Sequence, residues 1–106
     1  MKNVKIGVGV PVSHADAMRE ALANAGAGEM GDYSHASFSY RGFGRFKPLE
    51  GANPAIGEVG KLEEVEEERI DTICPKEKLR DVIAAIRAVH PYEEPAIDVT
   101  ELLNVD

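Results

Sequence analysis

The sequence predicts an α+β domain of the ferredoxin-like type, in which an antiparallel sheet carries two helices on one face. Three observations lead to this prediction. Apolar residues recur at every second position near both ends of the chain, which is typical of strands. Two stretches repeat apolar residues at helical spacing, and each follows a predicted strand. The resulting order, β-α-β-loop-β-α-β over 106 residues, fits a single domain spanning 1–106.

The N-terminal quarter holds the first strand and the first helix. Branched apolar residues alternate with glycine and lysine over 4–10, which predicts a strand that stops at Pro11. Apolar residues at helical spacing then predict a helix from Ser13 to Ala25, with Ser13 as its N-cap and Asp16 completing an approximate capping box. The "GAG" at 26–28 should cap its C-terminus.

The middle of the chain predicts a strand followed by a long loop. The segment "DYSHASFSY", 32–40, is rich in serine and aromatic residues and predicts the second strand, with His35 as a packed or hydrogen-bonded residue within it. Residues 41–60 are rich in glycine and proline, which predicts a structured loop with a short extra strand at Phe43–Lys47. A loop of this length in a small domain usually serves a function or an oligomer contact.

The stretch 61–74 supports two interpretations of its first half, a charge-rich helix or a strand. Alternation in the second half favours a strand. Val65 is out of register with Ile70, which predicts a bulge or a break between them. The acidic run "EEVEEE", 63–68, should form a solvated face.

The C-terminal third predicts the second helix and the last strand. Pro75 suits a helix start, and apolar residues from Leu79 to Val89 recur at i, i+3, i+4, i+7 and i+10. The helix should end near His90, because Pro91 disfavours helical geometry in the residue before it. The segment "AIDVTEL", 96–102, predicts the fourth strand.

Composition narrows the classes of partner. The chain has 12 basic and 19 acidic residues and a formal net charge of −7, which argues against nucleic acid and against anionic membrane surfaces. The same charge favours cationic partners such as metal ions. Cys74 is the only cysteine, so no internal disulfide can form. We find no signal-peptide pattern and no run long enough to span a membrane, and therefore expect a cytoplasmic protein.

The predicted topology brings three distant segments to one end of the sheet. These are the start of the first helix, the loop 41–60 and the turn "HPYEEP", 90–95. Loops held together on a rigid scaffold are where binding residues usually lie. We therefore expect a candidate site at this end.

The turn 90–95 offers the residue types that bind a divalent metal ion. His90, Glu93 and Glu94 supply an imidazole and two carboxylates, and these are the candidate metal ligands. The alternative is an ordinary helix end, whose histidine bonds the last carbonyls while the two prolines set the turn.

Other residues of this end are candidates for contacts to a small ligand. They are His14, beside the free amides of a helix start, together with Tyr92, Arg41 and Arg45. The arginines could hold a phosphate or a carboxylate, or they could belong to an interface loop. The sequence shows no nucleophile with a general base and no dinucleotide fingerprint, so we expect no catalytic residues and no enzyme.

Nearly the whole chain resembles a known family. The run "GDYSHASFSYRGFGRFKPLEGANPAIGEVGKLEEVEEERIDTICP" and the following "HPYEEPAIDV" resemble the insert domain of the YqfO branch of the Nif-three-like proteins; "PLEGANPAIG" and "HPYEEPA" are the distinctive parts. The resemblance implies a fold similar to CutA divalent-ion-tolerance proteins and PII signalling proteins, assembly as a homotrimer and ligand sites between subunits. The loop between strands two and three resembles the PII signalling loop in position.

The resemblance also limits what can be carried over. The larger flanking domain of the family, with its dinuclear metal site, has no counterpart in this sequence, so its hydrolase activity is not transferred. We therefore expect a stand-alone, non-enzymatic regulatory or sensing module that binds a divalent metal or a small anionic ligand. The alternatives are a purely structural oligomerisation module without a ligand and, ranked last, a metal-assisted hydrolase.

Overall fold

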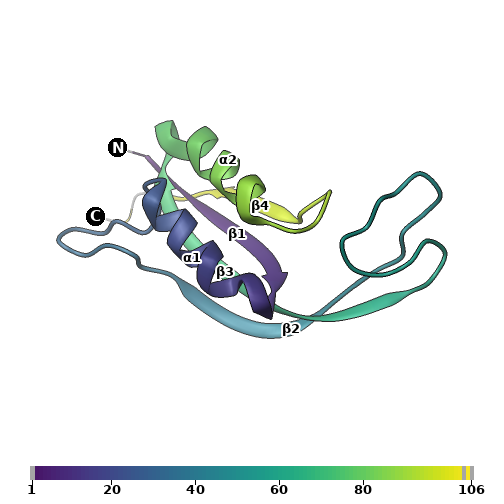
Figure 1. Cartoon of the computed structure of the whole chain (residues 1–106). Coiled ribbons are helices and arrows are strands. Elements are labelled where there is room, and N and C mark those ends of the chain that lie inside the picture. The colour runs from purple at the N-terminus through teal and green to yellow at the C-terminus, as the bar shows by residue number, and fades with distance from the viewer. Residues whose placement is uncertain (1, 104, 106) are drawn as a thin grey trace.

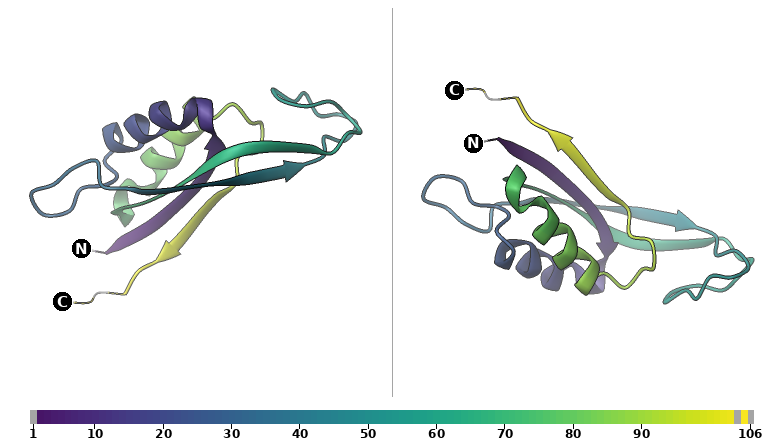
Figure 2. Two further views of the ribbon diagram at one scale, coloured as in Figure 1. Left: turned by 90° about the horizontal axis from the view of Figure 1, so that it is seen from below. Right: turned by 90° about the horizontal axis from the view of Figure 1, so that it is seen from above.

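The computed structural model describes residues 2–103 and 105, which form a four-stranded sheet with two helices on one face (Figures 1 and 2). The elements are β1 (Asn3–Pro11), α1 (Ala15–Asn24), β2 (Phe38–Phe46), β3 (Glu63–Pro75), α2 (Leu79–Val89) and β4 (Ile97–Glu101), with a 3-10 turn before each helix at Val12–His14 and Lys76–Lys78. The strand order is β2-β3-β1-β4, and all neighbours are antiparallel. The predicted ferredoxin-like fold is confirmed.

The hydrophobic core lies between the sheet and the two helices. Alternate residues of β1 and β3 point into it, because successive side chains of a strand point to opposite faces. The buried apolar residues are Val4, Ile6, Val8, Val10, Ile70 and Cys74 from the sheet, Ala15, Met18, Leu22, Val82 and Ile86 from the helices, and Ala27 from the segment after α1. None of the helices in the described residues combines the length and the apolar character needed to cross a membrane.

Among residues 2–103 and 105, no helix covers the opposite face of the sheet (Figure 2). Phe38 and Tyr40 stand on it with 68% and 52% of their surfaces exposed and ring centroids 6.1 Å apart. Arg69 reaches across Gly7, where a side chain would collide with the guanidinium group, and pairs with Asp98 on β4. The uncovered face therefore combines exposed aromatic rings with a cross-strand ion pair.

The predicted N-terminal cap of the first helix is wrong. Helix α1 begins at Ala15, two residues later than predicted, because Ser13 and His14 belong to the preceding 3-10 turn. The N-cap residue is His14 and makes no side-chain capping bond. The Ser13 hydroxyl contacts His14 Nδ1 at 2.9 Å, and Asp16 pairs with Arg19 instead of completing a capping box.

The predicted C-terminal cap is confirmed. Gly26 has a φ of +107°, a conformation that glycine adopts without a steric penalty. Its amide donates to the Ala23 carbonyl at 3.1 Å, and the Ala27 amide donates to the Leu22 carbonyl at 2.9 Å. These two bonds form a Schellman motif, which satisfies carbonyls that the helix end leaves free.

The second strand lies further along the chain than predicted. It spans Phe38–Phe46, not 32–40, so the short strand expected at Phe43–Lys47 belongs to it. The preceding residues form a loop that is held to β3 by the Gly28 amide, which donates to the Ile73 carbonyl at 2.7 Å. His35 lies exposed in this loop with a φ of +62°, a conformation that a regular strand excludes.

The third strand is continuous, so both the helical interpretation and the predicted bulge are wrong. Its pairing with β2 runs without interruption from Glu63 to Asp71. The acidic run is stabilised as a strand because Arg41 and Arg45 on β2 lie near its carboxylates. Glu68 within this run is buried, so the run is not a wholly solvated face.

Candidate functional site

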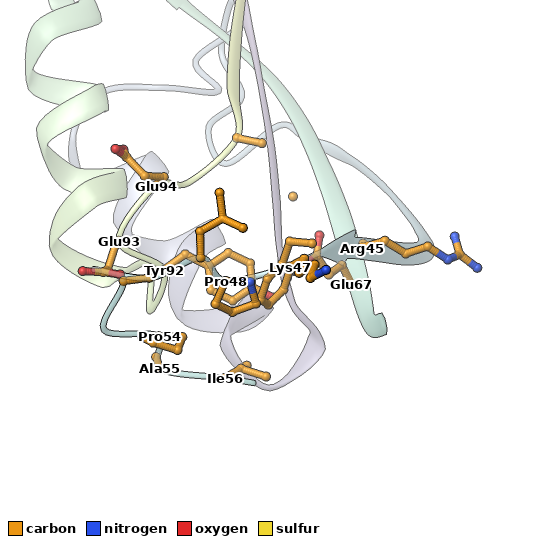
Figure 3. Close-up of a pocket in the computed structure, with 16 residues that line it drawn as sticks. Arg45, Lys47, Pro48, Pro54, Ala55, Ile56, Glu67, Tyr92, Glu93 and Glu94 are labelled. Carbon is orange, nitrogen blue, oxygen red and sulfur yellow. The ribbon is translucent and has the colours of Figure 1, made fainter. Parts of the chain in front are cut away.

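A cavity opens at the end of the sheet where the loop after β2 faces the turn after α2. Its volume is about 440 Å³ (Figure 3). The loop contributes Lys47, Pro48, Leu49, Ala52, Pro54, Ala55 and Ile56 to its lining, and the turn contributes Tyr92, Glu93, Glu94 and Ala96. The Asn53 amide donates to Glu93 Oε1 at 2.9 Å and so joins the two segments. The element order correctly predicts that these segments lie side by side.

The lining is mostly apolar, with polar groups at a few positions. Loop residues such as Pro48, Leu49 and Ile56 supply apolar surface, and Phe46 of β2 adds an aromatic ring. The charged or hydroxyl-bearing side chains of the lining are Arg45, Lys47, Glu67, Tyr92, Glu93 and Glu94. An apolar cleft with a small set of polar groups is the usual character of a small-molecule site.

Tyr92 and Glu67 form the best-defined polar contact of the cavity. The Tyr92 hydroxyl donates to Glu67 Oε2 at 2.8 Å, and the Phe46 ring meets the Tyr92 ring edge-on with centroids 5.4 Å apart. Burial, together with the neighbouring Glu67 carboxylate, raises the pKa of Tyr92, so the phenol stays protonated and keeps donating.

Two glycines leave room for the Glu67 carboxylate. A Cβ placed on Gly44 would lie 2.5 Å from Oε2, and one placed on Gly9 would lie 3.0 Å from Oε1. The carboxylate therefore lies over the backbone of two different strands. Sequence reasoning missed Glu67 because it lies inside the acidic run. Pairing this run with the preceding strand in a hairpin would have placed its carboxylates opposite the glycines and arginines of that strand, and this is the signal that could have found Glu67.

His90 ties the turn to the centre of the sheet. The residue is buried, at 7% exposure, and its Nε2 lies 2.7 Å from the Gly9 carbonyl oxygen. The Tyr92 amide donates to Nδ1 at 3.1 Å. Since a carbonyl only accepts and an amide only donates, Nε2 carries the proton and the ring is neutral. Burial also lowers the pKa of His90, which favours the same neutral form.

The three candidate metal ligands do not converge. Both ring nitrogens of His90 are occupied, and the carboxyl groups of Glu93 and Glu94 point away from Tyr92 (Figure 3). Within residues 2–103 and 105, no group of three or more His, Cys, Asp or Glu side chains is arranged to hold a metal ion. Metal binding here stays a prediction, and it requires His90 to give up at least one of its hydrogen bonds.

The remaining candidates are spread over this end of the molecule. Arg45 lines the cavity, but its guanidinium group points outward and pairs with Glu64 at 3.1 Å (Figure 3). Arg41 lies outside the cavity beside Glu68, 3.7 Å away. His14 also lies outside the lining. The cavity thus brings together Arg45, Tyr92, Glu93 and Glu94, and leaves out His14, Arg41 and His90.

Comparison with known sequences gives strong similarity to part of a longer protein. No family model matches the chain. It is 53% identical over 95 residues to a "GTP cyclohydrolase 1 type 2 homolog" of Bacillus subtilis, covering 90% of this chain and 26% of that protein. It is 51% identical over 100 residues to the protein of the same name from Halalkalibacterium halodurans, covering 94% and 27%. The chain therefore spans about a quarter of the length of these relatives.

Solved structures agree with this similarity and with the fold. A Bacillus cereus protein related to NIF3 superposes with a TM-score of 0.83 at 50% identity, over 97% of this chain and 26% of that one. The periplasmic divalent cation tolerance protein CutA of Archaeoglobus fulgidus gives 0.70 at 18% identity, over 97% and 86%. Bacillus subtilis GlnK gives 0.62 at 15% identity, over 96% and 86%. The last two share the fold alone, and the resemblance to Nif-three-like and CutA/PII-like proteins is confirmed.

Proposed function

We propose that this chain, a CutA/PII-like domain homologous to about a quarter of the NIF3-related proteins, is a non-enzymatic regulatory module that binds a small molecule. The observation that carries this proposal is the cavity of about 440 Å³ between the loop after β2 and the turn 90–96. Its apolar walls and few polar groups suit an organic ligand. A cytoplasmic location belongs to the same proposal.

The chemistry of the site favours binding over catalysis. His90 is buried as a neutral ring with both nitrogens bonded, so it is poorly placed to transfer protons. Cys74 lies in the core, and burial raises the pKa of its thiol, which keeps it unreactive. The relatives are named after a cyclohydrolase, but this chain spans about a quarter of them, so we do not propose that activity for it.

A tryptophan reporter tests the proposal. The chain contains no tryptophan, so Phe46→Trp places a unique fluorophore in the cavity wall, and Tyr33→Trp places a matched one outside it on an exposed position (78%). We would titrate both variants with nucleosides, amino acids, amines and organic acids, and with zinc, copper, nickel and manganese ions. We expect at least one compound to change the Phe46→Trp emission saturably and to leave Tyr33→Trp unchanged.

Two results would count against it. If both variants respond equally to every compound, or if the Phe46→Trp variant is folded by circular dichroism and responds to none, the cavity is not a ligand site. If the ligand is a metal ion bound by His90, the response must depend on that residue. A metal response should disappear when His90 is replaced by alanine.

A second function, self-association, is favoured by the uncovered face of the sheet. Phe38 and Tyr40 are exposed there, and burial of such rings commonly drives association. The resemblance to CutA and PII proteins implies a homotrimer. We propose that this face is an interface between copies of the chain, and that it can serve as an oligomerisation surface even without a ligand.

Sedimentation equilibrium tests this second function. We expect the wild-type chain to sediment well above the 11.5 kDa of one copy at about 100 μM, a concentration at which an interface worth about 8 kcal/mol is largely occupied. The double variant Phe38→Ser and Tyr40→Ser should dissociate, and Tyr33→Ser should not, because Tyr33 lies on the separate loop before β2. A monomeric wild type would refute the proposal, as would unchanged assembly of the double variant.

A further inference from the structure

We infer that Glu67 is the group that selects the ligand of the cavity, and that the ligand carries a cationic, nitrogen-based head on an apolar body. The inference rests on the proposed function, because it names the class of ligand for the same cavity. Four observations support it: the free oxygen of Glu67, the glycines beneath it, the rings beside it and the balance of charge around it.

The first observation is that one oxygen of Glu67 is already held and the other is free. Oε2 accepts the Tyr92 hydroxyl at 2.8 Å, which fixes the orientation of the carboxylate. Oε1 accepts no hydrogen bond from any residue in the described part of the chain. A carboxylate has about four lone-pair sites, so Oε1 can accept N–H donors from a ligand without breaking the bond to Tyr92.

The second observation is the placement of glycine. Gly44 lies within β2, where glycine costs roughly 0.5–1 kcal/mol relative to alanine. A Cβ at this position would lie 2.5 Å from Oε2 and 2.6 Å from Oε1, so any larger residue would displace the carboxylate. Gly42, two residues earlier on the same face of the strand, has nothing within 4 Å of its Cβ position. Of these two glycines of β2, Gly44 is therefore the one that Glu67 requires.

The third observation is the aromatic surface beside the carboxylate. The Phe46 and Tyr92 rings pack edge-on and both line the cavity. Aromatic faces attract cations, and they also supply apolar area to the body of a ligand. A carboxylate beside aromatic rings therefore suits a cation more than an anion.

The fourth observation is the charge around the cavity. Three carboxylates, those of Glu67, Glu93 and Glu94, line it against two cationic side chains. One of these cations, Arg45, points outward and pairs with Glu64. The carboxyl groups of Glu93 and Glu94 also point away from Tyr92. The lining as a whole nevertheless has three carboxylates against two cations, so its formal charge is negative and opposes an anionic ligand.

Benzamidine and benzoate provide matched probes, since both place a planar charged group on a phenyl ring and differ in the sign of the charge. We would measure the dissociation constant of each from amide chemical shifts of the ¹⁵N-labelled chain. We expect benzamidine to shift amides of 44–47 and 92–96 and to bind at least 10-fold more tightly than benzoate.

Variants locate the selectivity. Glu67→Gln keeps an acceptor for Tyr92 and removes the charge, so the preference for benzamidine should fall to about one. Gly44→Ala should lower the preference in the same way at little cost to folding, because a flexible carboxylate moves aside more easily than a backbone. Gly42→Ala is the matched control and should retain it.

Each contrary result is distinct from a failure of the proposed function. The inference would be overturned if benzoate bound as tightly as benzamidine, or if Glu67→Gln kept the preference for benzamidine. The cavity could then still be a ligand site, with Lys47 as the charged group that contacts the ligand. Binding of neither probe would also overturn it. The response of the Phe46→Trp reporter then decides the proposed function separately.

Discussion

Replacing Gly28 by alanine should lower the free energy of unfolding by about 2–4 kcal/mol, more than any other Gly→Ala change in the described glycines. Gly28 has a φ of +81°, a conformation that costs an L-residue roughly 1–2 kcal/mol. An added Cβ would lie 2.7 Å from the Ala36 carbonyl oxygen and 2.8 Å from the Ala36 nitrogen. Both obstacles are backbone atoms, so a change of rotamer cannot relieve the clash.

The surroundings of Gly28 cannot easily shift either. The Ala36 amide donates to the Gly28 carbonyl at 2.9 Å, and the Gly28 amide donates to the Ile73 carbonyl at 2.7 Å. The Thr72 hydroxyl donates to the Ala36 carbonyl at 2.7 Å. Moving Ala36 away would break its bonds to Gly28 and Thr72, and moving Gly28 would break the bond to Ile73. Each lost bond costs about 1 kcal/mol.

Gly31→Ala is the matched control for this prediction. Gly31 lies in the same loop with a φ of +56°, and nothing lies within 4 Å of its Cβ position. Gly31→Ala should lower the free energy of unfolding only by the cost of the positive φ, about 1 kcal/mol. Urea unfolding followed by circular dichroism measures both variants. Equal losses in the two would show that the contact with Ala36 contributes nothing.

This loop illustrates what the sequence could predict of the fold. The alternation in β1 and the helical spacing in α2 are local patterns, and both elements are confirmed. The predicted start of the second helix at Pro75 is wrong, because Pro75 ends β3 and α2 begins at Leu79 after a 3-10 turn. The position of β2 depends on bonds between Gly28, Ala36 and β3, which lie far apart in sequence. The prediction from composition, which relied on serine and aromatic residues, therefore starts this strand six residues too early. The acidic first half of β3 was ambiguous for the same reason, since its arginine partners lie on another strand.

The candidate site divides in the same way. Topology alone brought the loop and the turn together, because element order decides which ends of a sheet meet. Tyr92, Glu93 and Glu94 were found because the turn itself is unusual in composition. The place of Glu67 in the site could not be predicted from the sequence, because it depends on Gly44 and on the Tyr92 hydroxyl. No local sequence pattern connects these two groups to Glu67.

Replacing His90 by alanine should lower the free energy of unfolding by about 2–4 kcal/mol at pH 7.5. The change removes the bonds to the Gly9 carbonyl and from the Tyr92 amide, and it leaves a space where a buried ring was packed. The turn 90–96 then loses its attachment to β1. Amide hydrogen exchange in this turn should accelerate before global unfolding.

The loss caused by His90→Ala should also shrink as the pH falls. The pKa of His90 is lowered in the folded chain, mainly by burial, so the unfolded chain takes up the proton first once the pH drops below about 6.5. The stability that neutral His90 contributes is therefore complete above this pH and declines below it, by at most about 1.4 kcal/mol per pH unit. Urea unfolding at pH 7.5 and pH 5.5 measures the difference, with the exposed His35→Ala as the control. If His90→Ala and the wild type lose equal stability between the two pH values, His90 does not stabilise the attachment of the turn to the sheet through its neutral form.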